Sequence, residues 1–432
     1  MDKTLSIVLV VIMVAVIGIV AVYCGKSGEK YNKVTHLFNK VMETEVYTEV
    51  DEDFAYGQLA KKFDAYFEGG GCTAVGKTTM QDGLVIGRNM DFYITNKPSF
   101  VVKTDVPGRK KTFGLTYSNN MGDELDVVLE KGVKDSFYKM IPFMSTDVMN
   151  EDGFYIEINM RNADYDESGN SVFSCKGTNP GKKRLISFAL PYYLGSRCST
   201  VDEAVKMAQE ELDLYTPSQE SGMDWNFCFM LADATGKFGV LEIAKDKVVF
   251  NEAIENGDEM PHGACQANFY ITPEFNKIQK MKAGVGRFDY ASDKWASIET
   301  EDRMYAVMLG ISYFQSYFPY CMFDNRSEFV GIYDEDGEIF IGSKTPDEVD
   351  GEKVVWDYDY VTNPKNKKYV DAYIKYINGR LTSRRSDDSM DAYGAYWEST
   401  FTLTANPKNK TMFVRFNENN KDLYFFDFNE WK

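Results

Sequence analysis

The chain shows three patterns of hydrophobic and polar positions. Residues 5–24 (LSIVLVVIMVAVIGIVAVYC) carry no charge, and twenty helical residues span about 30 Å, the thickness of the hydrocarbon core of a bilayer. Residues 29–71 are polar, contain apolar positions at helical spacing and end in three glycines, Gly69–Gly71. From Cys72 onward, short apolar runs between turn residues predict strands.

The first hydrophobic segment favours an uncleaved membrane anchor over a cleaved secretion signal. A cleavable signal has a shorter apolar stretch, and Tyr23 stands where a lipoprotein signal would need a small residue before Cys24. Lysines on both sides leave the orientation open, and we expect the rest of the chain to lie outside the cytoplasm, either anchored or secreted. The chain then has three parts: residues 1–28 as an N-terminal signal or anchor segment, residues 29–71 as a helical prosegment, and residues 72–432 as one globular domain.

The strand signals after Cys72 occur in meanders with few helices between them. Thr200 and Glu203 form a capping box, which predicts a helix that runs through Leu212. Meanders with few intervening helices indicate an α+β layered domain rather than βαβ winding. The predicted strands cover residues 83–88, 153–160, a hairpin of 227–233 and 238–244, and a closing meander of 401–404, 412–416 and 423–428.

Residues 71–78 (GCTAVGKT) match the pattern of a phosphate-binding loop. Such a loop works only between a buried strand and a helix whose first amides bind the phosphates. The residues upstream are polar and helical in pattern, and Lys77 is followed by a turn at Asp82–Gly83 and then by a strand. We therefore predict no nucleotide site here.

Composition excludes several other kinds of chemistry. Lys and Arg number 48 against 66 Asp and Glu, so the net charge of −18 repels a phosphate backbone and argues against a nucleic-acid partner. Two histidines and seven cysteines without CxxC spacing are neither a zinc site nor a disulfide framework. No metal or organic cofactor is implied.

Cys72 is the most informative residue if the chain is cut after Gly71. It would then carry both a thiol and a free α-amine, whose pKa of about 7.7–8.0 suits it to accept a proton at neutral pH. Nucleophile and base come from one residue, so no histidine is needed. Arg88 and Asp91, three apart on the next predicted strand, could both face this terminus, with Arg88 favouring thiolate and Asp91 holding the amine.

These residues resemble the choloylglycine hydrolase and penicillin V acylase family of N-terminal nucleophile hydrolases. The family has Arg at +16 and Asp at +19 from its cysteine, inside a G-R-N-M/L-D run, and Arg88 and Asp91 stand at these positions. The similarity is thin between about residues 313 and 388, where the domain carries an acidic insertion around 314–388. Further similar runs are Met149–Gly153 leading to Asn159, Ala232–Lys237 followed by Glu242, Ala267-Asn268, and Gly286–Phe288 with Arg287.

The resemblance implies a four-layer αββα sandwich and the cleavage of linear N-acyl amides in a small-molecule substrate. Cys72 would attack the amide carbonyl. The side chain of Asn268 and the backbone N–H of Asn159 would form the oxyanion hole, and Arg287 would position the nucleophile through Asp91 or the thiol. The path from Gly153 to Asn159 is one residue shorter than in the family.

Two other functions stay open at this point. One is an N-acyltransferase of the same fold, which passes the acyl group to an amine instead of water. The other is an uncleaved, non-catalytic binding protein tethered to a membrane through residues 5–24. The sequence leaves the natural amide and the oligomeric state open, a homo-oligomer included.

Overall fold

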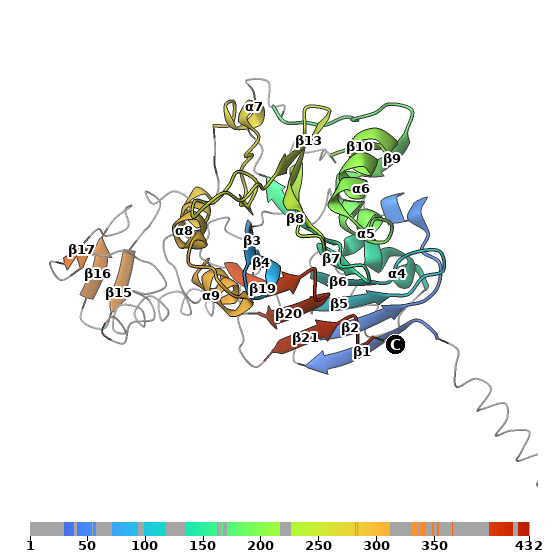
Figure 1. The fold of residues 1–432 in the computed structure, drawn as a ribbon, viewed down its shortest axis with the longest axis horizontal. Helices are drawn as coiled ribbons and strands as arrows, with labels where there is room; N and C mark the ends of the chain where they lie inside the picture. The colour runs from blue at the N-terminus through green and yellow to red at the C-terminus, as the bar shows by residue number, and fades with distance from the viewer. Residues whose placement is uncertain are drawn as a thin grey trace, which may run out of the picture.

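The computed structural model (Figure 1) shows two large β-sheets packed face to face, with helices on their outer sides. The residues that the structure describes are 30–38, 41–53, 55–57, 71–93, 99–117, 135–161, 164, 166, 171–216, 226–280, 282, 284–311, 331–334, 337–341, 348–349, 352–353, 365, 397–417 and 422–431.

The larger sheet has nine strands. They are antiparallel neighbours except for β2 and β5, which run parallel. In spatial order the strands are β1 (Lys33–Phe38), β2 (Val41–Val46), β5 (Ser99–Thr104), β6 (Thr112–Tyr117), β7 (Asp147–Asn150), β8 (Tyr155–Arg161), β11 (Asn226–Ala232), β12 (Phe238–Ala244) and β13 (Lys247–Glu252).

The smaller sheet has six antiparallel strands and contains Cys72. The strand β3 and the strand β4 form a hairpin, and β4 pairs in turn with the closing meander. In spatial order the strands are β14 (Cys265–Gln266), β3 (Gly71–Thr79), β4 (Gly83–Tyr93), β19 (Trp397–Asn406), β20 (Thr411–Phe416) and β21 (Leu423–Asp427).

Helices cover both outer faces. On the nine-stranded sheet lie α4 (Asp135–Met140), the 3₁₀ turns Ile141–Met144 and Ser187–Ala189, α5 (Leu190–Gly195) and α6 (Val201–Lys206), which continues as a π-helical turn, Met207–Glu211. On the six-stranded sheet lie α8 (Val285–Trp295) and α9 (Glu301–Ile311). The single turn α7 (Pro273–Asn276) lies apart from them, and its Phe275 packs with Ala244 of β12. Shorter strands are β9 (Lys183–Ile186), β10 (Leu212–Tyr215), β15 (Gly331–Asp334), β16 (Gly337–Ile341), β17 (Glu348–Val349) and β18 (Glu352–Lys353).

Two hydrophobic cores follow from the two-residue period of the strands. On β8, Ile156 and Ile158 pack with the helices of the nine-stranded sheet, whereas Tyr155 packs between the two sheets. On β11, Phe229 packs with the same helices, whereas Cys228 packs between the two sheets. The polar residues Glu157, Asn159 and Arg161 therefore share the face of β8 that meets the six-stranded sheet, together with Tyr155.

Several predicted elements are confirmed. The hairpin of β11 and β12 and the meander of β19, β20 and β21 lie where the sequence predicts them. Thr200 is the N-cap of α6 and accepts a hydrogen bond from the backbone N–H of Glu203, although the helix ends at Glu211 and Leu212 already begins β10.

The prediction of a helical stretch over residues 29–71 is wrong for its first half. Residues 33–38 and 41–46 are strands β1 and β2, and β2 joins the nine-stranded sheet through β5. The apolar spacing in this part of the chain fits a helix, but pairing with the exposed edge of β5 decides the conformation. Residues 52–53 and 55–57 are helical as predicted.

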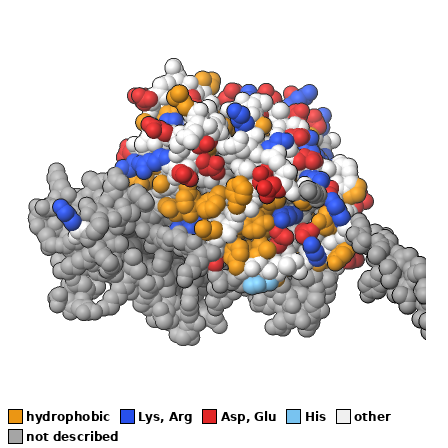
Figure 2. Space-filling model, turned by 60° about the horizontal axis from the view of Figure 1, so that its bottom comes forward, with side chains coloured by type: hydrophobic (Ala, Val, Ile, Leu, Met, Phe, Trp, Pro, Cys, Tyr) orange, Lys and Arg blue, Asp and Glu red, His pale blue; other side chains and the backbone are white. Residues whose placement is uncertain are grey.

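Within the described residues, no helix is long and apolar enough to cross a membrane. Residues 5–24, predicted as an anchor, lie outside the described residues. Most of the acidic insertion around 314–388 lies outside them as well, apart from short hairpins such as β15 and β16. Figure 2 shows hydrophobic side chains gathered on the face at the bottom of Figure 1, where the edge strands β1 and β21 lie, and Phe425 of β21 is 61% exposed.

Candidate active site

Cys72 lies near the start of β3, in the layer between the two sheets. It stands opposite Met90 of β4, its side chain is buried, and its Sγ lies 3.4 Å from the sulfur of Met90. Its backbone N–H donates a hydrogen bond of 3.1 Å to Oδ1 of Asn268. The nitrogen that the proposed chemistry would use is therefore held by a buried amide oxygen, and the thiol contacts a buried thioether.

The same strand excludes a phosphate-binding loop, as the sequence predicts. Gly71–Thr79 is one continuous strand, and a turn and a second strand follow it instead of a helix. The ammonium of Lys77 donates to the carbonyl of Trp295 at 3.0 Å and lies 3.9 Å from the centre of the Trp295 ring. The side chain of Lys77 is thus bound to the last residue of α8.

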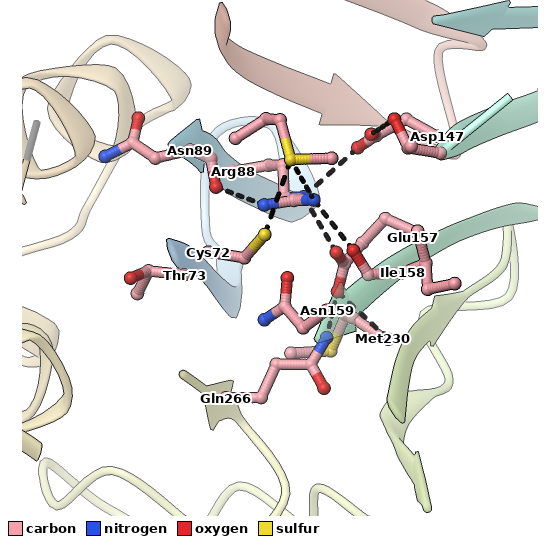
Figure 3. A network of polar contacts seen from close by, with 12 residues as sticks. Cys72, Thr73, Arg88, Asn89, Asp147, Glu157, Ile158, Asn159, Met230 and Gln266 are labelled. Carbon is pink, nitrogen blue, oxygen red and sulfur yellow. Dashed lines mark hydrogen bonds and ion pairs between the residues drawn. The ribbon is translucent and has the colours of Figure 1, made fainter. Parts of the chain in front are cut away.

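Arg88 approaches Cys72 on the inner face of β4, as Figure 3 shows. The guanidinium is fully buried, and its Nε lies 2.7 Å from Oε2 of Glu157 and 3.3 Å from Oδ1 of Asp147. Its Nη2 donates to the carbonyl of Ile158 at 2.8 Å. One buried cation thus faces two buried carboxylates beside the thiol.

Burial dominates the protonation of this cluster. It raises the pKa of the Cys72 thiol, and the nearby Arg88 opposes this only in part. Burial likewise raises the pKa of Asp147, and that of Glu157 to about 7. Burial alone would lower the pKa of Arg88, but the neighbouring Cys72 and the two carboxylates keep it well above its ordinary value. Arg88 is therefore charged, and burial favours the protonated form of both carboxyl groups.

Asp147 and Glu157 are further held by hydrogen bonds. Asp147 accepts from the hydroxyls of Tyr155 and Thr146, both at 2.9 Å. Glu157 accepts from the backbone N–H of Met230 at 3.1 Å and from the side-chain amide of Gln266. Sequence reasoning missed both acids. For Glu157, the signal was a charged residue inside the apolar run of residues 153–160, where an unpaired carboxylate is not expected.

Asp91 and Arg287 lie on the opposite face of β4. Asp91 accepts from the Ser399 hydroxyl at 2.6 Å, and its Oδ2 lies 3.4 Å from Nη1 of Arg287. Nη1 also donates to the carbonyl of Cys72 at 3.2 Å, and Nη2 donates to Oδ1 of Asn268 at 2.6 Å. Residues three apart on a strand point to opposite sides, so Arg88 and Asp91 approach Cys72 from opposite faces of β4.

Glycine is required at position 284, where α8 begins. Gly284 has φ +80°, and a Cβ there would lie 2.7 Å from Nη2 of Arg287. The glycine lets the Arg287 side chain pass close to the backbone on its way to Cys72.

Asn268 is held by a second buried ion pair. Arg161 donates to the carbonyl of Ala267, and its Nη2 lies 3.3 Å from Oε1 of Glu242. Glu242 also accepts from the backbone N–H groups of Ile271 and Thr272, both at 2.8 Å. This clamp fixes the residues on both sides of Asn268, whose Nδ2 donates to the carbonyl of Met160 at 2.7 Å.

Asn159 differs from the expectation for the oxyanion hole. The N–H of Ile158 donates to the carbonyl of Thr146, the residue before β7, and alternate N–H groups of a strand point to opposite sides, so the N–H of Asn159 faces β11. Its buried side chain has no hydrogen-bond partner for either Oδ1 or Nδ2 among the described residues. Figure 3 shows this carboxamide pointing into the space between Cys72 and Gln266.

The comparison with known protein families agrees with the resemblance that the residues around Cys72 predict. Residues 72–266 match the sequence profile of the linear amide C–N hydrolases, choloylglycine hydrolase family. The predicted resemblance to this family is confirmed. The matched range contains Cys72, Arg88, Asp91 and Asn159 and ends just before Asn268.

Similar solved structures come from two hydrolases. A mutant of the conjugated bile acid hydrolase from Clostridium perfringens is 14% identical, with a TM-score of 0.41, and the match covers 83% of this chain and 93% of that one. Penicillin V acylase from Agrobacterium tumefaciens is 14% identical, with a TM-score of 0.38, and the match covers 83% and 87%. No curated protein matches the chain.

A cavity of about 860 Å³ lies away from the residues around Cys72. It is lined by polar residues of the segment before Cys72 and of the domain, among them Glu52, Arg109 and Lys183. None of the six predicted site residues lines it, so we do not assign the chemistry to it. Among the described residues, no group of three or more His, Cys, Asp or Glu side chains is arranged to hold a metal ion.

Proposed function

We propose that the protein is a cysteine N-terminal nucleophile amidohydrolase that cleaves linear N-acyl amides through an acyl-enzyme on Cys72. The observation that carries this proposal is the set of contacts around one residue. The nitrogen of Cys72 bonds to Asn268, its carbonyl bonds to Arg287, and the buried Arg88 influences its thiol. The family match over residues 72–266 supports the reaction class.

The reaction requires that the chain be cut before Cys72. In the uncut chain the Cys72 nitrogen belongs to a peptide bond, which cannot accept a proton at neutral pH. After the cut, the free amine would take the proton of the thiol, and the thiolate would attack the amide carbonyl. The amine would then pass that proton to the departing amine as the C–N bond breaks. Water would hydrolyse the thioester, release the acid and return a proton to the thiol.

The oxyanion of each tetrahedral intermediate needs donors beside Cys72. The Nδ2 group of Asn159 is buried and has no partner among the described residues, so it is the donor we propose. Asn268 would hold the α-amine through its Oδ1, which already accepts from the Cys72 nitrogen. Asn268 thus acts on the base, and Asn159 acts on the substrate.

The substrate we propose is a small molecule with a linear amide, such as a bile salt, a penicillin or an acyl-homoserine lactone. We also propose that residues 5–24 hold the protein at a membrane, with the domain outside the cytoplasm. An N-acyltransferase of the same fold differs from the hydrolase only in the acceptor. Product analysis with a competing amine present therefore separates the two activities.

The test is a substrate panel on protein cut before Cys72. We expect amide cleavage by this protein, none by the uncut chain, and none by a cut protein that carries Cys72→Ala. Intact mass and N-terminal sequencing of protein from its natural host should show a terminus at Cys72. Cleavage by the Cys72→Ala protein at an undiminished rate contradicts the proposal. A full-length, inactive chain in the host favours the non-catalytic binding protein.

A further inference from the structure

The segment before Cys72 is part of the folded domain. Its strand β2 pairs in parallel with β5 over six residues, from Val41 opposite Ser99 to Val46 opposite Thr104, and β1 adds the outermost strand. In Figure 1 these two strands continue the nine-stranded sheet at its lower edge. Without them, β5 would present unpaired backbone groups to solvent.

The segment also contributes to both hydrophobic cores. Val41 is fully buried in the layer between the sheets, while Val46, Val50 and Ala55 are buried under the helices on the other side. The ring of Tyr56 packs edge-on against Phe143, with 5.3 Å between the ring centres. Removing the segment would therefore open both cores at once.

Charged contacts join the segment to the domain. Glu52 accepts from Arg109 at 3.0 Å and also binds Lys183 and Arg197. Burial raises the pKa of Glu52, but the basic side chains, Lys183 foremost, bring it below its ordinary value. Glu43 binds Lys103 at 2.7 Å, in addition to the contacts of Glu52.

We propose that the cut before Cys72 does not release the segment, and that the fragment ending at residue 71 stays bound as a non-covalent subunit of the enzyme. The cut itself rests on the proposed function. The edge of β5 is thus covered by the N-terminal segment of the same chain, held by the strand pairing, the shared cores and the ion pairs of Glu52 and Glu43. Any attachment made by residues 5–24 then persists after the cut.

The experiment uses the full chain in a mild detergent, with residues 66–71 replaced by the recognition sequence of a site-specific protease that leaves Cys72 as the first residue. After complete cutting, size-exclusion chromatography and mass spectrometry show which fragments elute together. We expect both fragments in one native peak and in two peaks under denaturing conditions. Release of the smaller fragment in native buffer overturns the proposal, whether or not the larger fragment stays soluble.

Two variants locate the contacts. Glu52→Ala should release the smaller fragment at least about ten times faster on dilution, because it leaves three basic side chains without their shared partner. Glu43→Gln provides the same test should Glu52→Ala fail to fold before the cut. Glu274→Ala is the control, because among the described residues its carboxylate forms an ion pair only with the exposed Lys247 of the domain. Unchanged release in both Glu52→Ala and Glu43→Gln overturns the assigned surface.

The outcome is independent of the proposed reaction. The same cut and the same chromatography can be carried out on a chain with Cys72→Ala, which is expected to be inactive. Retention of the fragment by the cut chain with Cys72 intact, without any amide cleavage, would leave the subunit proposal standing and contradict the proposed function. Amide cleavage by a domain that has lost its fragment would support the proposed function and contradict the subunit proposal.

Discussion

The two faces of β4 place different polar groups around Cys72. On the inner face, Arg88 contacts Glu157, Asp147 and the carbonyl of Ile158, all of which belong to the nine-stranded sheet. On the outer face, Arg287 contacts Asp91 and the backbone carbonyl of Cys72. One arginine faces two carboxylates and the thiol, whereas the other faces one carboxylate and the main chain.

This difference separates two tasks that the proposed mechanism assigns to Cys72. Groups on the inner face act on the thiol, since Arg88 lowers the pKa that burial raises. Groups on the outer face act on the main chain of Cys72, because Arg287 and Asn268 bind its carbonyl and its nitrogen. The direct contacts of the thiol thus lie on one face of the strand and those of the main chain on the other.

The largest effect should come from removing the inner arginine. Arg88→Ala leaves Asp147 and Glu157 buried together without a cation, and we expect it to lower the free energy of unfolding by about 3–5 kcal/mol at neutral pH. Arg287→Ala leaves one carboxylate, which still accepts from Ser399, and should cost less. Urea denaturation of both variants measures this. Equal losses would contradict the contrast between the faces.

The next effect concerns the unpartnered carboxamide. Asn159→Ala should lower kcat by about 10²–10³-fold, as in other enzymes that lose one oxyanion donor, and should change KM little. Asn226→Ala on β11 is the matched control, because that buried carboxamide already donates to Ser171. Steady-state kinetics on protein cut before Cys72 decides the matter. A fall in kcat of the same size in both variants would make Asn159 a structural residue.

The two faces should also shift the thiol in opposite directions. The charge of Arg88 lowers the pKa of Cys72, and that of Asp91 raises it, although burial is the largest influence. At a fixed pH below that pKa, Arg88→Ala should slow alkylation of the thiol and Asp91→Asn should accelerate it, each by about tenfold or less. Iodoacetamide rates on the cut protein measure both. A change of the same sign in both variants would contradict the prediction.

The sequence predicts this site unevenly, and the reasons are physical. Two adjacent strands of one hairpin contain Cys72, Arg88 and Asp91, so the local register brings these residues together. Asn268 and Arg287 come from distant segments, and only the family resemblance indicated them. Asp147 and Glu157 were not predicted, because their role depends on a contact with Arg88, which lies on the other sheet. The β2 strand escaped because its partner β5 follows more than fifty residues later.

The smallest effect is a change in pH dependence that reports on the inner carboxylates. Burial raises the pKa of Glu157 from 4.5 to about 7 in the folded protein. Between these values the folded state keeps a proton that the unfolded state has lost, so this group's contribution to stability decreases as pH rises from about 4.5 to about 7.

Glu157→Gln removes that titration and keeps a side chain of the same shape. We expect its midpoint of thermal unfolding to vary less between pH 4.5 and 7 than that of the unchanged protein, and to be equal or higher at pH 8. The control is Glu274→Gln, an exposed carboxylate that should leave the pH profile as it is. Identical pH profiles of thermal unfolding in the unchanged protein and Glu157→Gln would mean that Asp147, and not Glu157, is the inner carboxyl group that stays protonated in this range. Arg88 would then face a fixed negative charge at position 157, and the inner face would resemble the outer one more closely than its contacts suggest.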